Sequence, residues 1–514
     1  MQCRFPGTNA LDLNQIETIA FLGAEATHGA PVTRIDTSCA SVFLAGELAY
    51  KIKRAVDLGY LDFTTLAARE AACAAELALN RATAPNLYLR LAHVTRAAGG
   101  ALALDGAGAP IEPVVVMRRF ADGALASRAL DAGAIEGAMI ADLGRRLAAY
   151  HDACPRPAVP PRPVSLRLQQ CLPPILALRE IMPAPRIEAL VERMATAAAR
   201  ADPVVEARAR DGWWRRGHGD LHLGNLCLMA GQLLPFDALE FDDELATGDR
   251  LYDLGFLIMD LGRRGRADFA LALLDAYGPI GPGGGSLLPV FIALRALIRA
   301  FVAHNTWRTG GCAGPPPVEA VGAYLAVAEQ SLAAAGPRVI AVGGLSGTGK
   351  STLALALAPF IAPAPGALVL RSDAVRKALA GVAETERLPP DAYGPGSSEK
   401  VYARMFELAR AALAEGRSVI LDAVFARPGE RAAAAALAAD FAGLWLEAPL
   451  DLRQHRVDSR RNDASDATAT VAAAQEALDL GTIDWHRLTA GGDRGQVLAA
   501  ARARLAQGTS TAAP

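Results

Sequence analysis

The sequence predicts two unlike domains, an α+β domain followed by an α/β domain with a parallel sheet. The 514 residues exceed what one ordinary hydrophobic core supports. Beyond residue 338, short buried strands alternate with helices, which is the pattern of a parallel sheet. Gly336-Pro337 breaks the chain just before the first of these strands. We therefore expect domains over residues 1–335 and 336–506, followed by a small, polar and disordered tail over residues 507–514.

The composition is that of a soluble globular protein, with 52% hydrophobic and 21% charged residues. A formal net charge of −2 excludes a global field that attracts nucleic acid or an anionic membrane. The 7 cysteines contain no C-x-x-C pair, so neither a disulfide framework nor a zinc site is indicated, and we expect a cytoplasmic location. The apolar segments 251–261 and 287–303 are interrupted by charged residues, which indicates buried helices and no membrane partner.

The first domain is expected to contain a small sheet with a helix, followed by a largely helical part. Two short strands form a hairpin, a long helix follows, and a continuous apolar run predicts a buried strand. The expected segments are a helix over 16–22, strands over 41–44 and 48–52, a helix over 63–80, a strand pair within 94–104, a strand over 113–117, a helix over 134–151, a loop over 155–163, helices to about 211 and over 253–307, and a closing helix over 318–335.

The strongest motif lies between the apolar strand 339–342 and the helix 351–358. The turn between them fits G-x-x-x-x-G-K-[ST], the phosphate-binding loop (P-loop) motif, with Gly344, Gly349, Lys350 and Ser351 in the fixed places. Glycines let successive backbone N–H groups converge on phosphate oxygens, and the helix N-terminus adds partial positive charge. Lys350 then reaches the β- and γ-phosphates of ATP, and Ser351 holds Mg²⁺. The other loop residues that we assign to the nucleotide are Ser346, Gly347, Thr348 and Thr352.

Further strands of the second domain are followed by acidic residues. The strand over 367–370 is followed by Asp373, and the strand over 418–421 ends at Asp422. Carboxylates at this end of a parallel sheet face the ligand crevice. We expect Asp373 to accept the proton of an attacking hydroxyl, Arg376 to hold a substrate or γ-phosphate oxygen, and Asp422 to serve the Mg²⁺.

A basic helix follows the fourth strand of the second domain, which covers 443–446. Arg453, Arg456 and Arg460 recur at helical spacing, on one face of the predicted helix. This is either a solvated basic stripe or a lid whose arginines neutralise a transferring phosphoryl group. Its position after the fourth strand favours the lid, with residues 462–468 as a mobile turn. The order of these features resembles the P-loop kinases of the gluconate-kinase, polynucleotide-kinase and zeta-toxin type, which implies nucleotide contacts for Arg456 and Arg460.

The first domain carries a second constellation. His218, Asp220 and Asn225 fit H-x-D-x-x-x-x-N, and Asp237 follows a short apolar strand. This pair of motifs resembles the catalytic core of the aminoglycoside-phosphotransferase-like kinases, relatives of the protein kinases, and implies their bilobal fold. The resemblance implies that Asp220 is the catalytic base and that Asn225 and Asp237 hold Mg²⁺. His218 then orients the loop, and the helix residue Asp253 hydrogen-bonds it.

The same resemblance requires a strand lysine and a helix glutamate in the amino-terminal lobe. Lys51 fits best, with Lys53 as the alternate on the same face of the strand. Glu76 on the following helix is the expected partner of Lys51, and Glu70 is a weaker candidate. The segment 37–41 lacks a G-x-G-x-x-G pattern, so the sequence names no phosphate ligand there.

Taken together, the two halves resemble bacterial fusions of an aminoglycoside-phosphotransferase-like domain with a P-loop ATPase domain. We expect a bifunctional kinase that uses ATP and Mg²⁺ and phosphorylates hydroxyls of small molecules. One alternative is a single catalytic domain regulated by an ATP-binding partner domain. Another is a nucleic-acid end kinase, which the sequence disfavours because Trp445 and Trp485 are isolated and expected in the core. The acidic run 240–244 indicates either a cationic acceptor or a solvated turn, and the sequence predicts no oligomeric state.

Overall fold

The computed structural model describes residues 13–59, 61–157, 159–312, 314–333, 335–460 and 463–507. Apart from Gln507, the expected tail lies outside these residues. The contacts of the chain divide it into two compact units. The first unit comprises Met1–Pro161 and Ala209–Asp260, and the second comprises Arg162–Arg208 and Leu261–Pro514. The sequence boundary at residue 336 therefore lies inside the second unit, and a domain limit there stays a prediction.

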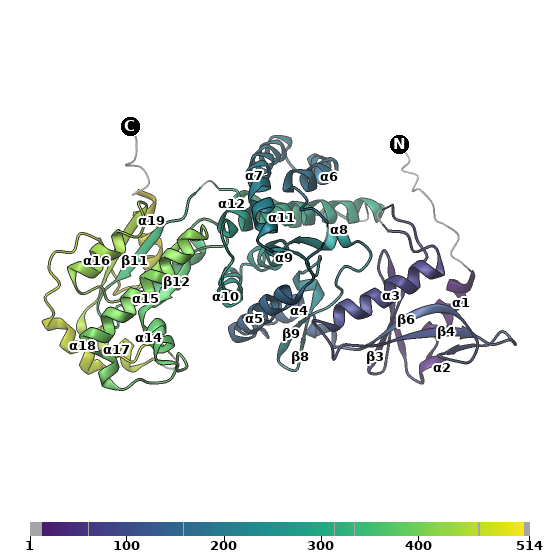
Figure 1. Cartoon of the computed structure of the whole chain (residues 1–514), viewed down its shortest axis with the longest axis horizontal. Coiled ribbons are helices and arrows are strands. Elements are labelled where there is room, and N and C mark those ends of the chain that lie inside the picture. The colour runs from purple at the N-terminus through teal and green to yellow at the C-terminus, as the bar shows by residue number, and fades with distance from the viewer. Residues whose placement is uncertain are drawn as a thin grey trace. The chain divides into compact units, whose positions relative to one another are not determined.

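An antiparallel sheet of six strands forms the amino-terminal lobe of the first unit, in the order β1-β2-β3-β6-β4-β5. Figure 1 labels β3, β4 and β6 of this sheet together with helix α3. One face buries Leu22, Phe43, Ile52 and Val114, and the other carries a second apolar cluster that includes Cys73 of α3. The strands are β1 (Val32–Asp36), β2 (Ala40–Ala45), β3 (Leu48–Lys53), β4 (Tyr88–Arg96), β5 (Leu102–Leu104) and β6 (Ala109–Arg118), and the helices are α1 (Leu13–Gly23), α2 (Glu25–His28) and α3 (Leu66–Arg81).

The remainder of the first unit places short strands between helices. Its two-stranded sheets are β7 with β10 and β8 with β9. The loop that carries Asp220 runs between β7 and β8, and Asp237 lies two residues after the end of β9. The elements are α4 (Ala126–Asp131), α5 (Gly137–Ala153), β7 (Trp214–Arg216), β8 (Leu226–Met229), β9 (Gln232–Pro235), α8 (Asp243–Ala246), β10 (Thr247–Asp249) and α9 (Arg250–Arg263), the last of which continues across the unit limit.

The second unit begins with long helices, namely α6 (Val164–Ala177), α7 (Ala184–Arg210), α10 (Ala267–Tyr277), α11 (Gly284–Thr309) and α12 (Val318–Ser331). Leu271 of α10 belongs to the same buried cluster as Ile340 of the following sheet, and Arg417 pairs with Asp275 at 2.5 Å. Among the described residues, α11 alone is long and apolar enough to cross a membrane, and 67% of its apolar window is buried inside the protein. Mostly buried core helices of soluble proteins pass the same test.

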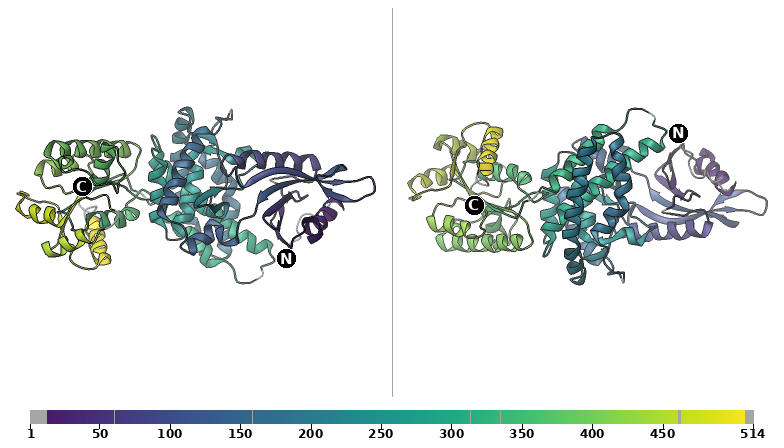
Figure 2. Two further views of the ribbon diagram at one scale, coloured as in Figure 1. Left: turned by 90° about the horizontal axis from the view of Figure 1, so that it is seen from below. Right: turned by 90° about the horizontal axis from the view of Figure 1, so that it is seen from above.

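A parallel sheet of five strands forms the rest of the second unit, in the order β12-β13-β11-β14-β15. One face packs against α13 and α19, and the other packs against α14, α15 and α16. In Figure 2 the green helix α15 and the yellow helix α19 lie on opposite sides of this part of the chain. The elements are β11 (Val339–Gly343), α13 (Lys350–Leu357), β12 (Leu368–Arg371), α14 (Ser372–Ala380), α15 (Pro395–Ala414), β13 (Val419–Asp422), α16 (Pro428–Ala435), β14 (Phe441–Glu447), α17 (Leu450–Asp458), α18 (Ala469–Ala474), β15 (His486–Thr489) and α19 (Arg494–Gln507).

The fold class agrees with the sequence prediction, and three local features differ. Strands β1 and β15 were not predicted, because most of their side chains are exposed and give no apolar run. Asp373 lies in the first turn of α14, since this helix begins at Ser372. Helix α17 ends at Asp458, so Arg460 lies beyond the helix and the predicted face of three arginines is wrong.

Candidate active sites

Three charged side chains from distant parts of the first unit meet at one point. The ammonium of Lys51 on β3 lies 2.7 Å from Glu76 Oε1 on α3 and 2.5 Å from Asp237 Oδ1 after β9. Thr65 caps α3 by accepting the Ala68 N–H, which fixes where the helix of Glu76 begins. The structure therefore brings together the lysine, the glutamate and the aspartate that the sequence had named separately.

The alternate lysine has partners of its own. Lys53 Nζ lies 2.6 Å from Glu76 Oε2 and also binds Glu240. Burial by itself raises the pKa of Glu76, but the two lysines overcome this and hold it at about 2. Because Lys51 contacts Asp237 and Lys53 contacts Glu240, the geometry favours Lys51 as the lysine nearest the predicted metal ligands. The sequence did not assign Glu240 to this network.

Glu70 does not join the network. Its carboxylate lies 3.0 Å from His93 Nε2 near the surface. The acidic run is also largely occupied by internal contacts, since Glu240 pairs with Lys53, Asp242 caps α8 and Asp243 lies 3.0 Å from Arg216. These contacts remove most of the support for a cationic acceptor at this run.

A buried aspartate holds the loop that carries Asp220. Asp253 on α9 accepts the N–H of His218 at 2.5 Å and the N–H of Gly219 at 2.9 Å. Burial lowers the pKa of His218, so the ring is neutral at neutral pH. Its Nδ1 accepts the Asp220 N–H at 3.3 Å, and Nε2 therefore carries the proton and donates to the Phe236 carbonyl at 3.1 Å. His218 thus links the loop of Asp220 to the residue that precedes Asp237.

Within this loop, Asp220 and Asn225 are hydrogen-bonded. Asn225 Nδ2 donates to the Asp220 backbone carbonyl at 3.0 Å and to Oδ2 at 2.8 Å, which leaves Asn225 Oδ1 for another ligand. Asp237 has a φ of 61°, a left-handed conformation that is uncommon for a residue with a side chain and that clusters at functional sites. His222 accepts the Gly224 N–H at 2.9 Å and packs on Phe256, and its Nε2 lies 3.5 Å from Asp220 Oδ2.

The donor set suits Mg²⁺ held by a nucleotide. No group of three or more His, Cys, Asp or Glu side chains is gathered for a metal within the described ranges. Mg²⁺ in nucleotide sites needs only one or two protein oxygens, because phosphates and water complete its coordination. Asn225 Oδ1 and the Asp237 carboxylate fit that requirement, and Phe236, next to Asp237, donates its N–H to the Asn225 carbonyl at 2.9 Å.

In the second unit the P-loop turns sharply between β11 and α13. Gly344, Gly347 and Gly349 have φ values of 139°, 86° and 96°, which residues with side chains rarely adopt. The Lys350 ammonium donates to the Leu345 carbonyl at 3.1 Å, so it folds back over the loop. Burial lowers the pKa of Lys350 and raises that of Asp422, and each group opposes the shift of the other. The Ser351 hydroxyl also opposes the rise in the pKa of Asp422, and both residues, which are expected to hold Mg²⁺, line the second cavity described below.

Two cavities adjoin at the P-loop. The first has a volume of about 340 Å³ and is lined by Gly347, Thr348, Gly349, Ser351 and Thr352, together with the start of α19. The second has a volume of about 440 Å³, and its lining includes Ser346, Lys350, Asp373, Arg376 and Asp422. Ser351 and Arg460 line both cavities, so the two spaces meet beside the loop.

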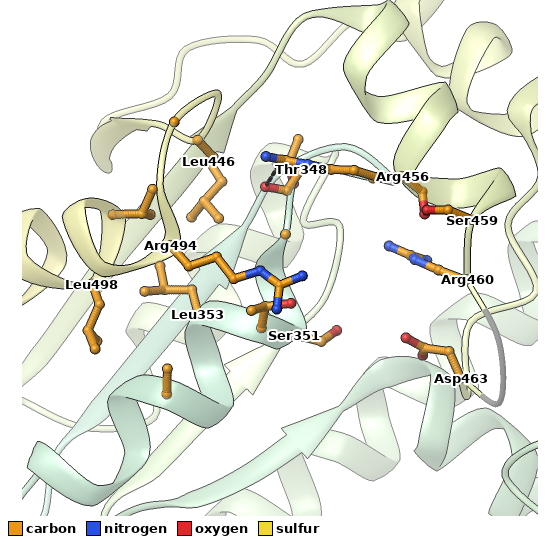
Figure 3. Close-up of a pocket in the computed structure, with 17 residues that line it drawn as sticks. Thr348, Ser351, Leu353, Leu446, Arg456, Ser459, Arg460, Asp463, Arg494 and Leu498 are labelled. Atoms are coloured by element: carbon orange, nitrogen blue, oxygen red, sulfur yellow. Dashed lines mark hydrogen bonds between the residues drawn. The ribbon is translucent and has the colours of Figure 1, made fainter.

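Three guanidinium groups surround the first cavity. In Figure 3, Arg494 extends from the start of α19 toward Ser351, while Arg456 and Arg460 approach from the side of α17. Arg456 also donates to the Thr348 carbonyl at 3.4 Å. Arg494 was not predicted, because a lone arginine at a helix start carries no distinguishing pattern. Arg453 is 1% exposed and binds Glu476. It therefore stabilises the packing beneath the P-loop and does not line either cavity.

Asp373 and Arg376 line the second cavity from α14. The Arg376 guanidinium donates to the Ala392 carbonyl at 2.7 Å and lies 4.8 Å from the centre of the Tyr393 ring. The predicted lid turn is joined to the same region, since Asp463 pairs with Arg371 at 2.6 Å and Asp466 pairs with Lys377 at 2.7 Å. Residue 462 of that turn lies outside the described residues.

Neither Trp445 nor Trp485 lines the two cavities. Trp445 is 2% exposed, and Trp485 packs on the rings of Phe425 and Phe441 at 5.1 and 5.9 Å. Both belong to the apolar cluster on the α14–α16 face of the sheet, as the sequence predicted.

We expect Gly347→Ala to lower the free energy of unfolding of the second unit by about 1–3 kcal/mol, the cost of a strained backbone conformation. A Cβ at Gly347 would lie 2.4 Å from the Arg453 carbonyl oxygen, and the φ of 86° disfavours any side chain. Urea denaturation followed by far-ultraviolet circular dichroism measures the change. Gly429→Ala in α16 is the control, because nothing lies within 4 Å of its added Cβ, and it should leave stability unchanged or slightly higher.

The fold and the two sites define a protein with two kinase-like phosphotransferase domains. The chain belongs to the bacterial family that joins an aminoglycoside-phosphotransferase-like domain to a P-loop kinase-like domain. The model of the phosphotransferase enzyme family matches residues 62–288, and the model of an AAA domain matches residues 339–479. Its relatives include the uncharacterized proteins Rv2004c of Mycobacterium tuberculosis and Mb2027c of Mycobacterium bovis, each 34% identical over 478 residues, which cover 89% of this chain and 92% of the relative.

Two solved structures each match part of the chain. A choline/ethanolamine kinase family protein from Mesorhizobium loti is 18% identical, with a TM-score of 0.39, and covers 61% of this chain and 94% of its own. A gluconokinase from Sinorhizobium meliloti is 21% identical, with a TM-score of 0.25, and covers 33% of this chain and 93% of its own.

Proposed function

We propose that the chain is a bifunctional ATP-dependent phosphotransferase of the cytoplasm, with each kinase-like domain transferring the γ-phosphoryl of ATP to a hydroxyl of a small molecule. The observation that supports the proposal is that each half gathers cationic groups suited to bind phosphates, with at least one carboxylate next to them. In the second unit two cavities meet at Ser351 and Arg460, with Asp373 in the second. In the first unit Lys51, Glu76 and Asp237 form one ion-paired cluster.

In the P-loop half, the nucleotide lies in the first cavity and the acceptor in the second. Backbone N–H groups of residues 346–350 bind the phosphates, and Lys350 neutralises the phosphate charge that develops during transfer. Arg456 and Arg460 add charge from the side of α17. Asp373 accepts the acceptor's proton, and Arg376 holds the acceptor from the same helix. Ser351 and Asp422 would hold Mg²⁺, which would neutralise negative charge on the phosphates.

In the first half, Lys51 binds the nucleotide phosphates while Glu76 keeps its ammonium in place. Asp220 takes the proton of the acceptor hydroxyl, and Asn225 orients Asp220 through its amide. Asn225 Oδ1 and Asp237 would hold Mg²⁺, which shields charge on the transferring group. Loop and cavity residues differ freely on such folds, so the acceptors have to be found by experiment.

Two single variants of the full chain separate the halves. ATP consumption is followed against a library of alcohols, sugars and amino alcohols for the wild type, Lys350→Ala, Asp237→Asn and the double variant. We expect each single variant to lose one set of acceptors by at least about 100-fold, because a group that stabilises the transferring phosphoryl is removed, and the double variant to lose all. Wild-type turnover that neither substitution reduces would refute the proposal. Loss of every acceptor in one single variant would mean that only one half is catalytic.

A further inference from the structure

A glutamine side chain accepts a hydrogen bond from the backbone of the P-loop. Gln475 Oε1 accepts the backbone N–H of Ser346 at 2.7 Å, across 129 positions of sequence. Gln475 lies just after α18 and lines the second cavity. Backbone N–H groups of such a loop are the donors that bind phosphate oxygens. A neutral amide oxygen therefore lies where the loop offers a donor to an anion.

The position of Ser346 indicates which phosphate its N–H serves. Gly347, Thr348 and Gly349 line the first cavity, whereas Ser346 and Lys350 line the second. A nucleotide seated in the first cavity therefore meets Ser346 at the far end of its phosphate chain. Since Lys350 serves the β- and γ-phosphates, the Ser346 N–H faces the last of these, the γ-phosphate.

The residues around the Gln475–Ser346 hydrogen bond are held by contacts of their own. Arg453 donates to the Ser346 carbonyl at 3.4 Å and binds Glu476, the neighbour of Gln475. The Arg453 carbonyl also packs against Gly347, since a Cβ added at Gly347 would lie 2.4 Å from the Arg453 carbonyl oxygen. Arg453 of α17 thus binds the Ser346 carbonyl, and Gln475 after α18 binds the Ser346 N–H. Because its surroundings are fixed in this way, Gln475 is held against the loop and is not a freely moving surface side chain.

We infer that Gln475 is a positioning residue that competes with the γ-phosphate for the Ser346 N–H and thereby sets the preference of the P-loop between nucleoside triphosphate and diphosphate. With a diphosphate bound, the Gln475 contact persists, because no γ-oxygen is present to replace it. With a triphosphate bound, a γ-phosphate oxygen takes the N–H and Gln475 turns into the second cavity. After transfer the contact forms again, which favours departure of the phosphorylated product. The inference rests on ATP binding at this loop as proposed above.

Nucleotide titrations of the full chain test this directly. Isothermal titration calorimetry measures the Kd of Mg²⁺–ADP and of Mg²⁺ with the non-hydrolysable ATP analogue adenylyl imidodiphosphate, for the wild type, Gln475→Ala, Gln475→Glu and the control Gln454→Ala. Gln454 is on α17, and its side-chain amide donates to the Ala469 carbonyl at 3.5 Å. Binding that Lys350→Ala abolishes is assigned to the P-loop.

We expect Gln475→Ala to lower the Kd of the triphosphate analogue about 2- to 10-fold relative to the Kd of ADP, because one competing hydrogen bond is removed. Gln475→Glu should raise the Kd of the analogue more than the Kd of ADP, because a carboxylate repels the γ-phosphate. Gln454→Ala should leave the ratio unchanged. Equal changes for both nucleotides, or a weaker analogue in Gln475→Ala, would overturn the inference while nucleotide binding stands. Absence of any Lys350-dependent binding in the wild type would instead refute the proposed function.

Discussion

Replacing Glu76 by alanine is expected to lower the free energy of unfolding of the first unit by about 3–5 kcal/mol, the usual cost of removing one partner from a buried ion pair. Glu76 is fully buried, and its two oxygens lie 2.7 Å from Lys51 Nζ and 2.6 Å from Lys53 Nζ. Without this carboxylate, the ammonium groups of Lys51 and Lys53 repel each other in a site of low dielectric, and each keeps one acidic partner, Asp237 or Glu240. Urea denaturation of the full chain, followed by tryptophan fluorescence and circular dichroism, measures the loss.

Glu70→Ala is the matched control for this experiment. Glu70 lies on the same helix, but its side chain is 43% exposed and pairs with His93. An exposed pair of this kind contributes about 0–1 kcal/mol, so the control should unfold close to the wild type. Similar losses in both variants would show that the helix, and not the buried carboxylate, accounts for the effect.

The same carboxylate predicts how stability depends on pH. The pKa of Glu76 falls from 4.5 in its ordinary state to about 2 in the folded chain. A lowered pKa contributes stability that is fully present above the unfolded value, near pH 4.5, and is lost as the pH falls toward 2. We therefore expect the wild type to lose stability between pH 5 and pH 2 more steeply than Glu76→Gln, with Glu70→Gln following the wild type. Parallel curves for all three would contradict the assignment.

Replacing Asp220 by asparagine is expected to slow phosphoryl transfer by the first half about 10²- to 10⁴-fold, the range for loss of a general base. The loop should keep its shape, because His218 and Gly219 remain anchored on Asp253 at 2.5 and 2.9 Å. Asparagine has nearly the size of aspartate but takes up a proton poorly. The rate is measured with Lys350→Ala present, so that only the first half turns over ATP with an acceptor found in the library.

Asp242→Asn serves as the control for this change. Asp242 caps α8, and asparagine caps helices about as well, so activity and stability should stay near those of the parent. A loss of rate in Asp220→Asn that comes with an equally weakened Kd for ATP would contradict a role as base. That outcome would place Asp220 in nucleotide binding instead.

Much of the architecture could be predicted from local sequence. The strand 339–342, the glycine-rich turn and the following helix agree with β11 and α13 within one or two residues. The reason is that a P-loop is a local structure whose glycines must adopt positive φ, as Gly347 and Gly349 do. Exposed strands such as β15 gave no signal, since a strand with one buried residue has no apolar run.

The residues of the first site were predicted one at a time, but their contacts were not. Nothing in the spacing of Lys51 and Lys53 distinguishes the two, because both point to the same face of β3. Their different roles arise from Asp237 and Glu240, which lie more than 180 positions further along the chain. Likewise, periodicity placed Arg453 and Arg460 on one face, whereas the end of α17 at Asp458 separated a buried arginine from one that lines the cavities.

The sequence by itself determined the two kinase-like folds, the phosphate loop and the acidic side chains, because each depends on residue types at short, fixed spacing. The tertiary structure alone decided which lysine contacts Asp237, that Glu240 is an internal partner, and that Gln475 reaches the Ser346 N–H. These contacts join residues far apart along the chain. Their geometry follows from how sheets and helices pack, which no local pattern encodes.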